Sequence, residues 1–348
     1  MDTSTTIEEE WTDPDGLLEL LYDYRYKEAE SLLKRLISEE ETAHLYHRLG
    51  YVLLAQNRHD GARKQHKRAA QICPSEPDYA CAVAVVDSKL LPKSRQLKRL
   101  MELGRHDTVL CSIGDFLVNL GLYREAVSVY ELTPTHWERF EIYCRLCGAY
   151  IGLEMWDKAD EYVELAAKIH PNCSLVSYYD FMILLGQRKF QEAWDIANEL
   201  EPEADSRPIA YKLAGISYLY QRKFPQAIEK FSAAIQLLPW MSDIYYYRAA
   251  CHACLKEHDL GRNDINKALK SSMDEAYVLR LKYILELRAF AYPHAARTLI
   301  ELLLYRFQHT VCRYNSKLLL KKARKQGFFD RSLEPVKEDV WPPAPKGG

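Results

Sequence analysis

The sequence carries one position at which a small residue recurs at nearly constant spacing. Successive members of the set are separated by 33, 64, 33, 34, 34, 34 and 34 residues. The gap of 64 spans about two intervals, and its midpoint falls near another small residue, Ser94. A fixed period of this length indicates copies of one supersecondary unit, each of which buries its apolar face only against its neighbours. The recurring residues are Ala29, Ala62, Ala126, Ala159, Ala193, Ala227, Gly261 and Ala295.

Residues 208–241 show what one unit must fold into. Four residues from Tyr211 to Tyr218 follow one another at i, i+3, i+4 and i+7, which places them on one face of an α-helix. Pro225 stands where a second helix would begin, in a first-turn position that proline tolerates. Pro239 ends the unit because proline cannot continue a helix.

The residues at the contact between the two helices set how closely they pack. Gly215 and Ala227 are small enough to allow close approach, and Phe231 would fill the space beside them. Other units have His66 or Lys98 at the position of Phe231. We therefore expect looser packing in those units.

The spacing from Tyr211 to Pro239 resembles the tetratricopeptide repeat, a helix–turn–helix unit of 34 residues. The resemblance extends over about 300 residues of the chain. It implies an all-α fold, a right-handed α-solenoid of about nine helix–turn–helix repeats. The third repeat, about residues 77–106, is the shortest and least typical.

We expect the solenoid to occupy residues 17–309 as one elongated domain, since no linker interrupts the period. The second helix of the last unit, Thr298 to Phe307, is apolar over most of its surface and needs a cover. A C-terminal capping helix over residues 310–327 would supply that cover for Leu299, Leu303 and Leu304.

The ends of the chain differ from the solenoid in composition. Residues 1–16 carry six acidic side chains and no basic one, and we expect them to be disordered. Residues 313–331 carry seven basic side chains and one acidic. Within them the cluster Lys321-Lys322-x-Arg324-Lys325 fits either the solvated face of a capping helix or a patch for nuclear localisation or an acidic partner. Residues 328–348 are expected to form a flexible tail.

Overall composition excludes several classes of protein. The formal net charge of −2 gives no broad electrostatic footprint for nucleic acid. No apolar run of 18 residues and no N-terminal signal segment occurs, so we expect no membrane insertion. Nine cysteines, an odd number spread through predicted helices, favour a reducing compartment, the cytoplasm or alternatively the nucleus.

Two pairs of cysteines have the spacing of a metal-binding or redox motif. They are Cys144/Cys147 and Cys251/Cys254, and His258 follows the second pair. A structural zinc ion needs four converging ligands, but the pairs lie three repeats apart and the second group offers at most three. Both pairs lie within predicted helices, away from a helix N-terminus where a thiolate would be stabilised. We therefore expect structural cysteines and no metal.

No catalytic motif is present in the sequence. The patterns GxGxxG, GxxxxGK[ST], HExxH and GxSxG are all absent. The eleven histidines stand in no recognisable order with a nucleophile and a carboxylate. The cluster of His44, His47 and His66 is expected to be solvated or to line a groove. These observations predict a protein that is not an enzyme and needs no cofactor.

In tetratricopeptide-repeat proteins the first helix of each unit lines a concave surface, and the resemblance implies the same here. In the sixth to ninth units these positions are rich in apolar and aromatic residues, a surface that usually binds a partner. The alternative is that a tight superhelix covers these side chains itself. The predicted partner-binding residues are Tyr178, Tyr179, Met182, Lys212, Ile216, Tyr220, Tyr246, Tyr247, Tyr277 and Arg280.

Three classes of function fit such a groove. The first is a scaffold or adaptor that binds an apolar or amphipathic protein segment, with Lys212 and Arg280 contacting its acidic groups. The second is a permanent structural subunit of a larger assembly. The third, an RNA-processing repeat protein, would need basic residues recurring along the groove. Only Lys212, Arg280 and Arg288 occur there in four units, so no nucleic-acid partner is expected.

One subclass of this family binds chaperone C-terminal carboxylates through Lys, Asn and Arg residues of successive units. Lys212 fits that pattern. Ile216 and Tyr247 stand at the asparagine positions, and Tyr277 and Leu281 replace the final Lys and Arg. Chaperone tails are therefore not the expected partner.

Overall fold

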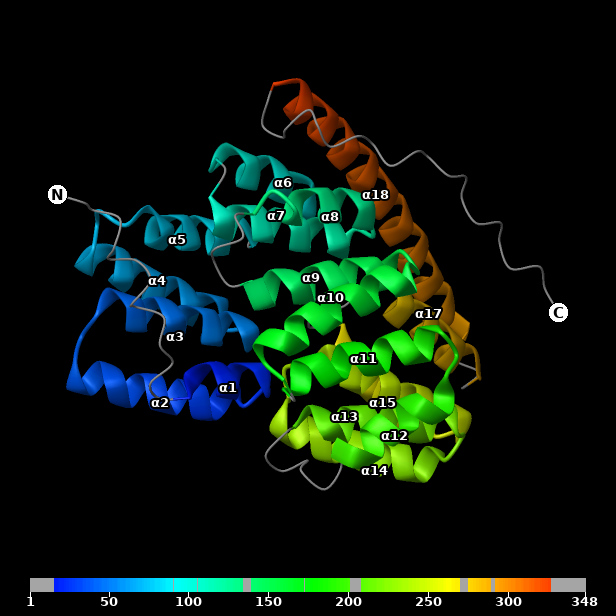
Figure 1. Ribbon diagram of the computed structural model, residues 1–348. Helices are drawn as coiled ribbons and strands as arrows, with labels where there is room; N and C mark the ends of the chain where they lie inside the picture. Colours follow the sequence, from blue (N-terminus) through cyan, green and yellow to red (C-terminus); the bar gives the residue numbers. More distant parts are fainter. Residues whose placement is uncertain are drawn as a thin grey trace.

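The described part of the chain folds into eighteen α-helices (Figure 1). The structure is a computed structural model, and it describes residues 16–89, 91–104, 106–133, 139–171, 173–200, 208–269, 275–288 and 292–326. The predictions for the acidic N-terminus and for the C-terminal tail concern residues outside these ranges, apart from Gly16. No helix among the described residues is both long and apolar enough to cross a membrane.

Consecutive helices pair in chain order, α1 with α2 through α17 with α18, and each pair packs on the next. The predicted all-α solenoid of about nine helix–turn–helix units is thereby confirmed for the described residues. The helices are α1 Leu17–Tyr22, α2 Tyr26–Glu39, α3 Ala43–Ala55, α4 His59–Ile72, α5 Pro77–Lys89, α6 Lys93–Glu102, α7 Asp107–Asn119, α8 Tyr123–Tyr130, α9 Arg139–Gly152, α10 Trp156–Ile169, α11 Ser174–Gly186, α12 Phe190–Leu200, α13 Ile209–Tyr220, α14 Phe224–Leu237, α15 Ser242–Cys254, α16 His258–Ala268, α17 Glu275–Arg288 and α18 Tyr292–Lys325.

The turns inside the units repeat as regularly as the helices. In the seventh unit Arg222 joins α13 to α14 with a φ of 59°, in the left-handed region that usually favours glycine. The equivalent residues are separated by the same intervals as the small residues of the helices, so one turn geometry is imposed on different side chains. They are Tyr24, Asn57, Gly121, Glu154, Arg188 and Lys256.

Close packing within a unit depends on a glycine facing an aromatic ring. A Cβ atom added to Gly215 would lie 2.5 Å from the ring of Phe231, so only glycine allows this contact. Phe231 and Ala227 are fully buried. The predicted roles of these three residues are confirmed.

The expectation of looser packing around His66 is wrong. His66 is fully buried, and a Cβ atom added to Gly50 would lie 2.5 Å from its ring. His66 therefore takes the place of Phe231, since its flat ring has a similar shape. Its Nδ1 lies 3.2 Å from Nδ1 of His47, which is also buried, so this pair is part of the core and is not solvated.

The first two units contact units far along the chain. The Oδ1 atom of Asp23 accepts a hydrogen bond of 2.9 Å from the backbone nitrogen of Ser174 at the start of α11. The side-chain amide of Asn57 donates a hydrogen bond of 3.4 Å to the carbonyl of Trp240, which follows α14. The N-terminal units therefore bridge to the sixth and seventh units.

The last helix makes an equivalent contact from the other end of the chain. Helix α18 passes along one edge of the molecule to α6 (Figure 1). Arg313 donates a hydrogen bond of 3.3 Å to the carbonyl of Gly121, and the ammonium of Lys317 lies 3.8 Å from the carboxylate of Glu125. The ninth unit thus closes against the fourth.

This arrangement differs from the predicted capping helix. Residues 310–325 continue the second helix of the last unit without a break, as part of α18. They cover units three and four, while Leu299, Leu303 and Leu304 remain exposed. The sequence shows that the end of α18 has an apolar face, but the fold decides what it packs against.

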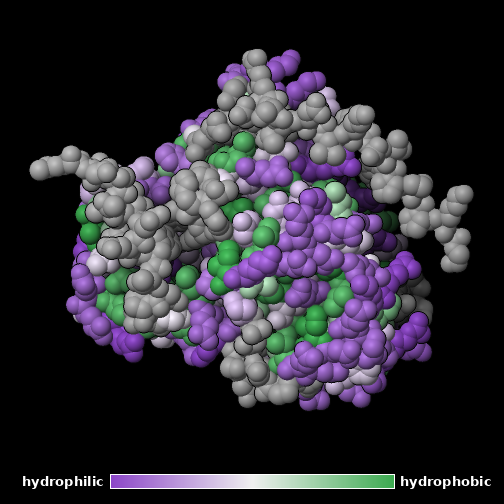
Figure 2. Space-filling view, viewed as in Figure 1, coloured by the Kyte–Doolittle hydropathy of each residue, from purple (hydrophilic) through white to green (hydrophobic). Residues whose placement is uncertain are grey.

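The predicted elongated shape is also wrong. One core cluster joins Tyr22, Val85, Tyr130, Cys173 and Leu320, which belong to units at both ends and in the middle of the chain. Contacts between units that are not neighbours fold the solenoid back on itself. The face shown in Figure 2 is largely hydrophilic, with apolar patches between rows of hydrophilic side chains.

Candidate functional site

Lys212, in the predicted groove, forms an ion pair with another residue of the same chain. Its ammonium lies 2.6 Å from the carboxylate of Asp243 and 4.6 Å from the ring centroid of Tyr178, and its side chain is 3% exposed. Burial alone would lower the pKa of Lys212, but the carboxylate of Asp243 outweighs it and raises that pKa above its ordinary value. The acidic group that we expected a partner to supply is here supplied by the next unit.

Other residues of the predicted groove pack around this ion pair. Ile216 is buried, and the ring of Tyr247 stacks on Phe231 with centroids 5.9 Å apart. Burial raises the pKa of the Tyr247 hydroxyl above its ordinary value. Tyr24 from the first unit packs on the same cluster. A large part of the concave face of units six to eight is therefore filled from within.

The structure separates the ten predicted residues into three groups. Tyr178, Tyr179, Met182, Tyr246 and Tyr247 are half-buried, and Lys212 and Ile216 are buried. Tyr220 and Arg280 are exposed, and Tyr220, at 57%, stacks on the exposed ring of Phe190. Tyr277 lies in the first turn of α17, but its side chain lies outside the described part.

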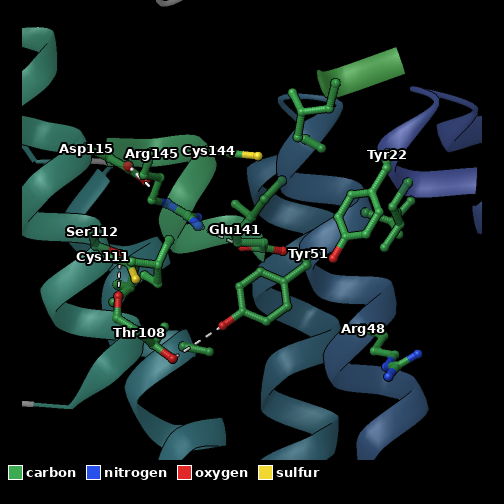
Figure 3. A pocket seen from close by; sticks show the side chains of 18 of the residues that line it. Tyr22, Arg48, Tyr51, Thr108, Cys111, Ser112, Asp115, Glu141, Cys144 and Arg145 are labelled. Carbon is green, nitrogen blue, oxygen red and sulfur yellow. Dashed lines mark hydrogen bonds and ion pairs between the residues drawn. The ribbon is translucent and has the colours of Figure 1, made fainter. Parts of the chain in front are cut away.

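An open cavity lies instead in the N-terminal half of the superhelix (Figure 3). It has a volume of about 540 Å³ and is lined chiefly by α1, α3, α5, α7, α9 and α11, the first helices of the first six units. Of the predicted partner-binding residues whose side chains the structure describes, Tyr179 alone lies in its wall. The sequence pattern marks these helices as concave, but not which part of the concave face stays open.

One side of the cavity carries a charged cluster. Arg145 on α9 pairs with Asp115 on α7 at 3.3 Å and with Glu141 at 2.7 Å. The hydroxyl of Tyr130 donates a hydrogen bond of 2.7 Å to Asp115. Burial would lower the pKa of Arg145, but the two carboxylates raise it, so the guanidinium stays charged. The cluster has a formal charge of −1 and is satisfied internally.

The facing wall is aromatic and polar. The hydroxyl of Tyr51 on α3 lies 3.5 Å from Oγ1 of Thr108 on α7, which links two units across the cavity (Figure 3). Two buried side chains of the wall, Thr133 and His66, have a polar atom without a hydrogen-bond partner among the described residues, Oγ1 and Nε2 respectively. Burial lowers the pKa of His66 to about 4, so its ring is neutral near pH 7. Both of these atoms are buried, so the part of the wall that a guest can reach is formed by side chains such as Tyr51, which is exposed, and Thr108, which is half-buried.

The cysteine pairs do not form a metal centre among the described residues. No group of three or more His, Cys, Asp or Glu side chains converges there in a way that could hold an ion. Cys144 and Cys147 are buried, and burial raises the pKa values of their thiols. Burial likewise raises the pKa of Cys251 to about 12, while Cys254 is exposed. Such thiols are poorly suited to redox chemistry.

The family follows from sequence matches that coincide with helix pairs. Two stretches of the chain, residues 42–73 and 212–276, match family models described as tetratricopeptide repeat. The first stretch covers the whole of α3 and α4, and the second begins within α13 and ends in α17. The chain is a tetratricopeptide-repeat protein. Its other tetratricopeptide units are recognised through their structure, because the same helix pair recurs on both sides of the matched stretches.

Three solved structures share the fold at low sequence identity. A tetratricopeptide repeat protein from Parabacteroides merdae aligns with a TM-score of 0.52 and 14% identity, over 73% of this chain and 98% of its own. The APC/C hetero-tetramer Cut9–Hcn1 gives 0.56 and 14%, over 88% of this chain and 63% of the other. An IFIT1 monomeric mutant with Gppp-AAAA gives 0.52 and 11%, over 86% and 87%. No curated protein is significantly similar in sequence. These similarities support the fold alone.

Proposed function

We propose that this protein is a non-catalytic scaffold that binds a short segment of a protein partner in the cavity described above. Tetratricopeptide repeats generally mediate protein–protein interactions. The observation that carries the proposal is the open cavity itself, whose wall presents the rings of Tyr51 and Tyr179 beside the half-buried side chain of Thr108. A pocket of this size, within the range of about 300–1,000 Å³ usual for ligand sites, accommodates a few side chains of a guest.

The charges in the wall indicate what the segment contains. Three basic residues, Arg48, Lys89 and Arg145, face three acidic ones, Asp107, Asp115 and Glu141, so the lining has no net formal charge apart from its histidine. Arg145 is already neutralised by two carboxylates. The fitting guest is therefore apolar or aromatic with uncharged hydrogen-bonding groups, in agreement with the apolar or amphipathic segment expected from the sequence.

The same charges disfavour two other partners. A nucleic acid needs a surplus of basic side chains along its path, and this cavity has none. A chaperone C-terminal carboxylate needs a free lysine, but Lys212, the one residue that matches the carboxylate-binding pattern, pairs with Asp243. The likeness to the IFIT1 structure with Gppp-AAAA extends to the fold only, at 11% identity.

Other predicted partner-binding residues, outside the cavity lining, are proposed as additional contacts. Tyr220 and Arg280 are proposed as secondary contacts because both are exposed. The half-buried tyrosines of units six and eight would contact the partner only through their exposed edges.

A permanent subunit of a larger assembly differs from an adaptor in the lifetime of the complex, which a dilution experiment measures. A cytoplasmic or nuclear location is proposed from the cysteine content alone.

Site-directed photo-cross-linking tests the proposal. A photoreactive phenylalanine analogue replaces Tyr51 in the full chain, and Met155, an exposed residue outside the cavity lining, receives the same analogue as the control. The proposal predicts one cross-linked partner segment from position 51 and none from position 155. A partner that cross-links only from positions 220 or 280 would place binding outside the cavity and overturn the proposal.

A further inference from the structure

Helix α18 has two apolar faces on opposite sides. Its inner face buries Leu302, Cys312 and Leu320 against the rest of the chain. At 3.6 residues per turn, a second set of large apolar residues points the other way. These residues are between 41% and 63% exposed. Single apolar residues are common on protein surfaces, but a continuous exposed apolar stripe is unusual in a monomeric protein. The stripe consists of Ile300, Leu304, Val311, Tyr314 and Leu318.

The spacing of the stripe is that of a coiled-coil seam. Its members follow at intervals of four, then seven, three and four residues, and Phe307 stands in the sequence at the point that divides the seven into three and four. Alternating steps of three and four keep one seam on a helix facing one partner helix. The stripe from Ile300 to Leu318 is about 27 Å long at 1.5 Å per residue.

We infer that this stripe is a dimerisation seam, on which α18 of a second copy of the chain packs antiparallel to the first. The stripe is symmetric about position 309. In the antiparallel arrangement Ile300 lies opposite Leu318 of the second copy, and Leu304 lies opposite Tyr314 of the second copy. Each apolar position therefore meets another under one two-fold axis, which is the usual symmetry of a homodimer.

The charges along α18 select this orientation. Its basic side chains gather at the C-terminal end, where Lys317, Lys321, Lys322 and Lys325 fall within nine residues. A parallel pair would bring two such ends within the screening length of about 8–10 Å. The antiparallel pair separates them by most of the length of the seam.

The residues flanking the centre of the seam favour a second copy over an unlike helix. Gln308, Thr310 and Asn315 are uncharged, whereas coiled coils that select a different partner do so through charges at these flanking positions. Near the two-fold axis Gln308 and Thr310 each face their own counterparts, with no like charges opposed.

The size of the seam sets the strength of the dimer. A contact about 27 Å long between helices about 10 Å apart buries roughly 600 Å² in total, below the ~1,200 Å² of a standard stable interface. The dimer should therefore dissociate at micromolar concentration, and the association should be visible between about 1 and 200 µM.

Sedimentation velocity on the full chain tests this inference. The wild type should shift from monomer to dimer over that range, and a Leu304→Glu, Val311→Glu variant should stay monomeric with unchanged helix content. Leu260→Glu is the matched control, because Leu260 on α16 is 54% exposed, as Leu304 is at 56%. A wild type that stays monomeric throughout, or a double variant that dimerises equally, overturns the inference. If deletion of residues 327–348 is needed for dimerisation, the occupant of the stripe is the chain's own tail, which also overturns it.

Orientation is tested by disulfide trapping. Gln308→Cys lies next to the two-fold axis and should form an intermolecular disulfide, whereas Lys322→Cys lies far from its counterpart and should not. Equal trapping from both positions would show a parallel pair and contradict the proposed arrangement.

Discussion

The ammonium of Lys212 lies 2.6 Å from the carboxylate of Asp243, one unit further along the chain, and almost none of the lysine side chain is exposed. A buried ion pair is weak evidence of net stabilisation, but loss of one partner leaves an uncompensated charge. This pair therefore ties α13 to α15 and removes Lys212 from the surface available to a partner.

Asp243→Asn should destabilise the fold by about 2–3 kcal/mol, below the full range for a buried pair because Asp243 is partly exposed. Adding Lys212→Met should recover most of the loss. Urea unfolding measures both. The control is Glu161→Gln, because the Lys158–Glu161 pair has the same 2.6 Å distance but is exposed, so it should change stability far less than Asp243→Asn does. Equal losses from both pairs would contradict burial of Lys212.

The Lys212–Asp243 pair should also make the stability of the fold depend on pH under alkaline conditions. The pKa of Lys212 is raised in the folded state, so its contribution is complete below the unfolded-state pKa of about 10.4. It should be lost as the pH rises above that value. The unfolding temperature should therefore fall more steeply between pH 10 and pH 12 for the wild type than for the Lys212→Met, Asp243→Ala variant.

At acidic pH, the stability of the fold should depend on the protonation of His66. Burial lowers its pKa to about 4, and that of His47 to about 3, so the unfolded chain binds more protons below about pH 6.5. Stability should therefore fall between pH 6.5 and 4. His66→Phe, which copies Phe231 at the equivalent position, should remove on the order of 2 kcal/mol of that fall. An unchanged acid profile in this variant would show that His66 is accessible to solvent.

Phe231→Ala should cost about 3–5 kcal/mol, the range for truncation of a buried aromatic residue. The ring fills the space over Gly215 and stacks on Tyr247, so its loss affects two units. Hydrogen exchange should show faster opening in α13 to α15. Unaltered melting, with changes confined to the surface near residue 231, would contradict this packing.

Deletion of residues 310–348 should loosen units three and four as well as the last unit. The removed part of α18 contains Leu320 and Ala323, which are buried in the core cluster of those units, and Arg313, which binds the carbonyl of Gly121. Hydrogen exchange in α6 to α8 should increase. The shorter deletion of residues 332–348 is the control and should leave these helices unchanged, whereas an effect confined to α17 would support the original idea of a local cap.

The sequence predicts the helix pairs and the small residues that repeat with the period, although not the tight packing of His66 at the position of Phe231. Gly215, Ala227 and Phe231 could be assigned because a helix pair has one way to bring small and large residues together. The open part of the concave face could not, because it depends on contacts outside the period, such as Asp23 with Ser174. Lys212 is an intermediate case. Both it and Asp243 occupy concave positions in successive units, so their opposite charges were a readable signal of internal pairing.

The most direct test of the central claim is the affinity of the cross-linked partner segment, as a synthetic peptide, for a variant with a filled cavity. Ser112 lines the cavity, and Ser112→Phe should reduce affinity at least tenfold by occupying the space. Ser128→Phe is the matched control. Both serines are half-buried and donate a hydrogen bond to the carbonyl four residues earlier, but Ser128 does not line the cavity. Calorimetry should show wild-type affinity for the Ser128 variant. Unchanged affinity in Ser112→Phe, with the fold intact, would contradict binding in this cavity.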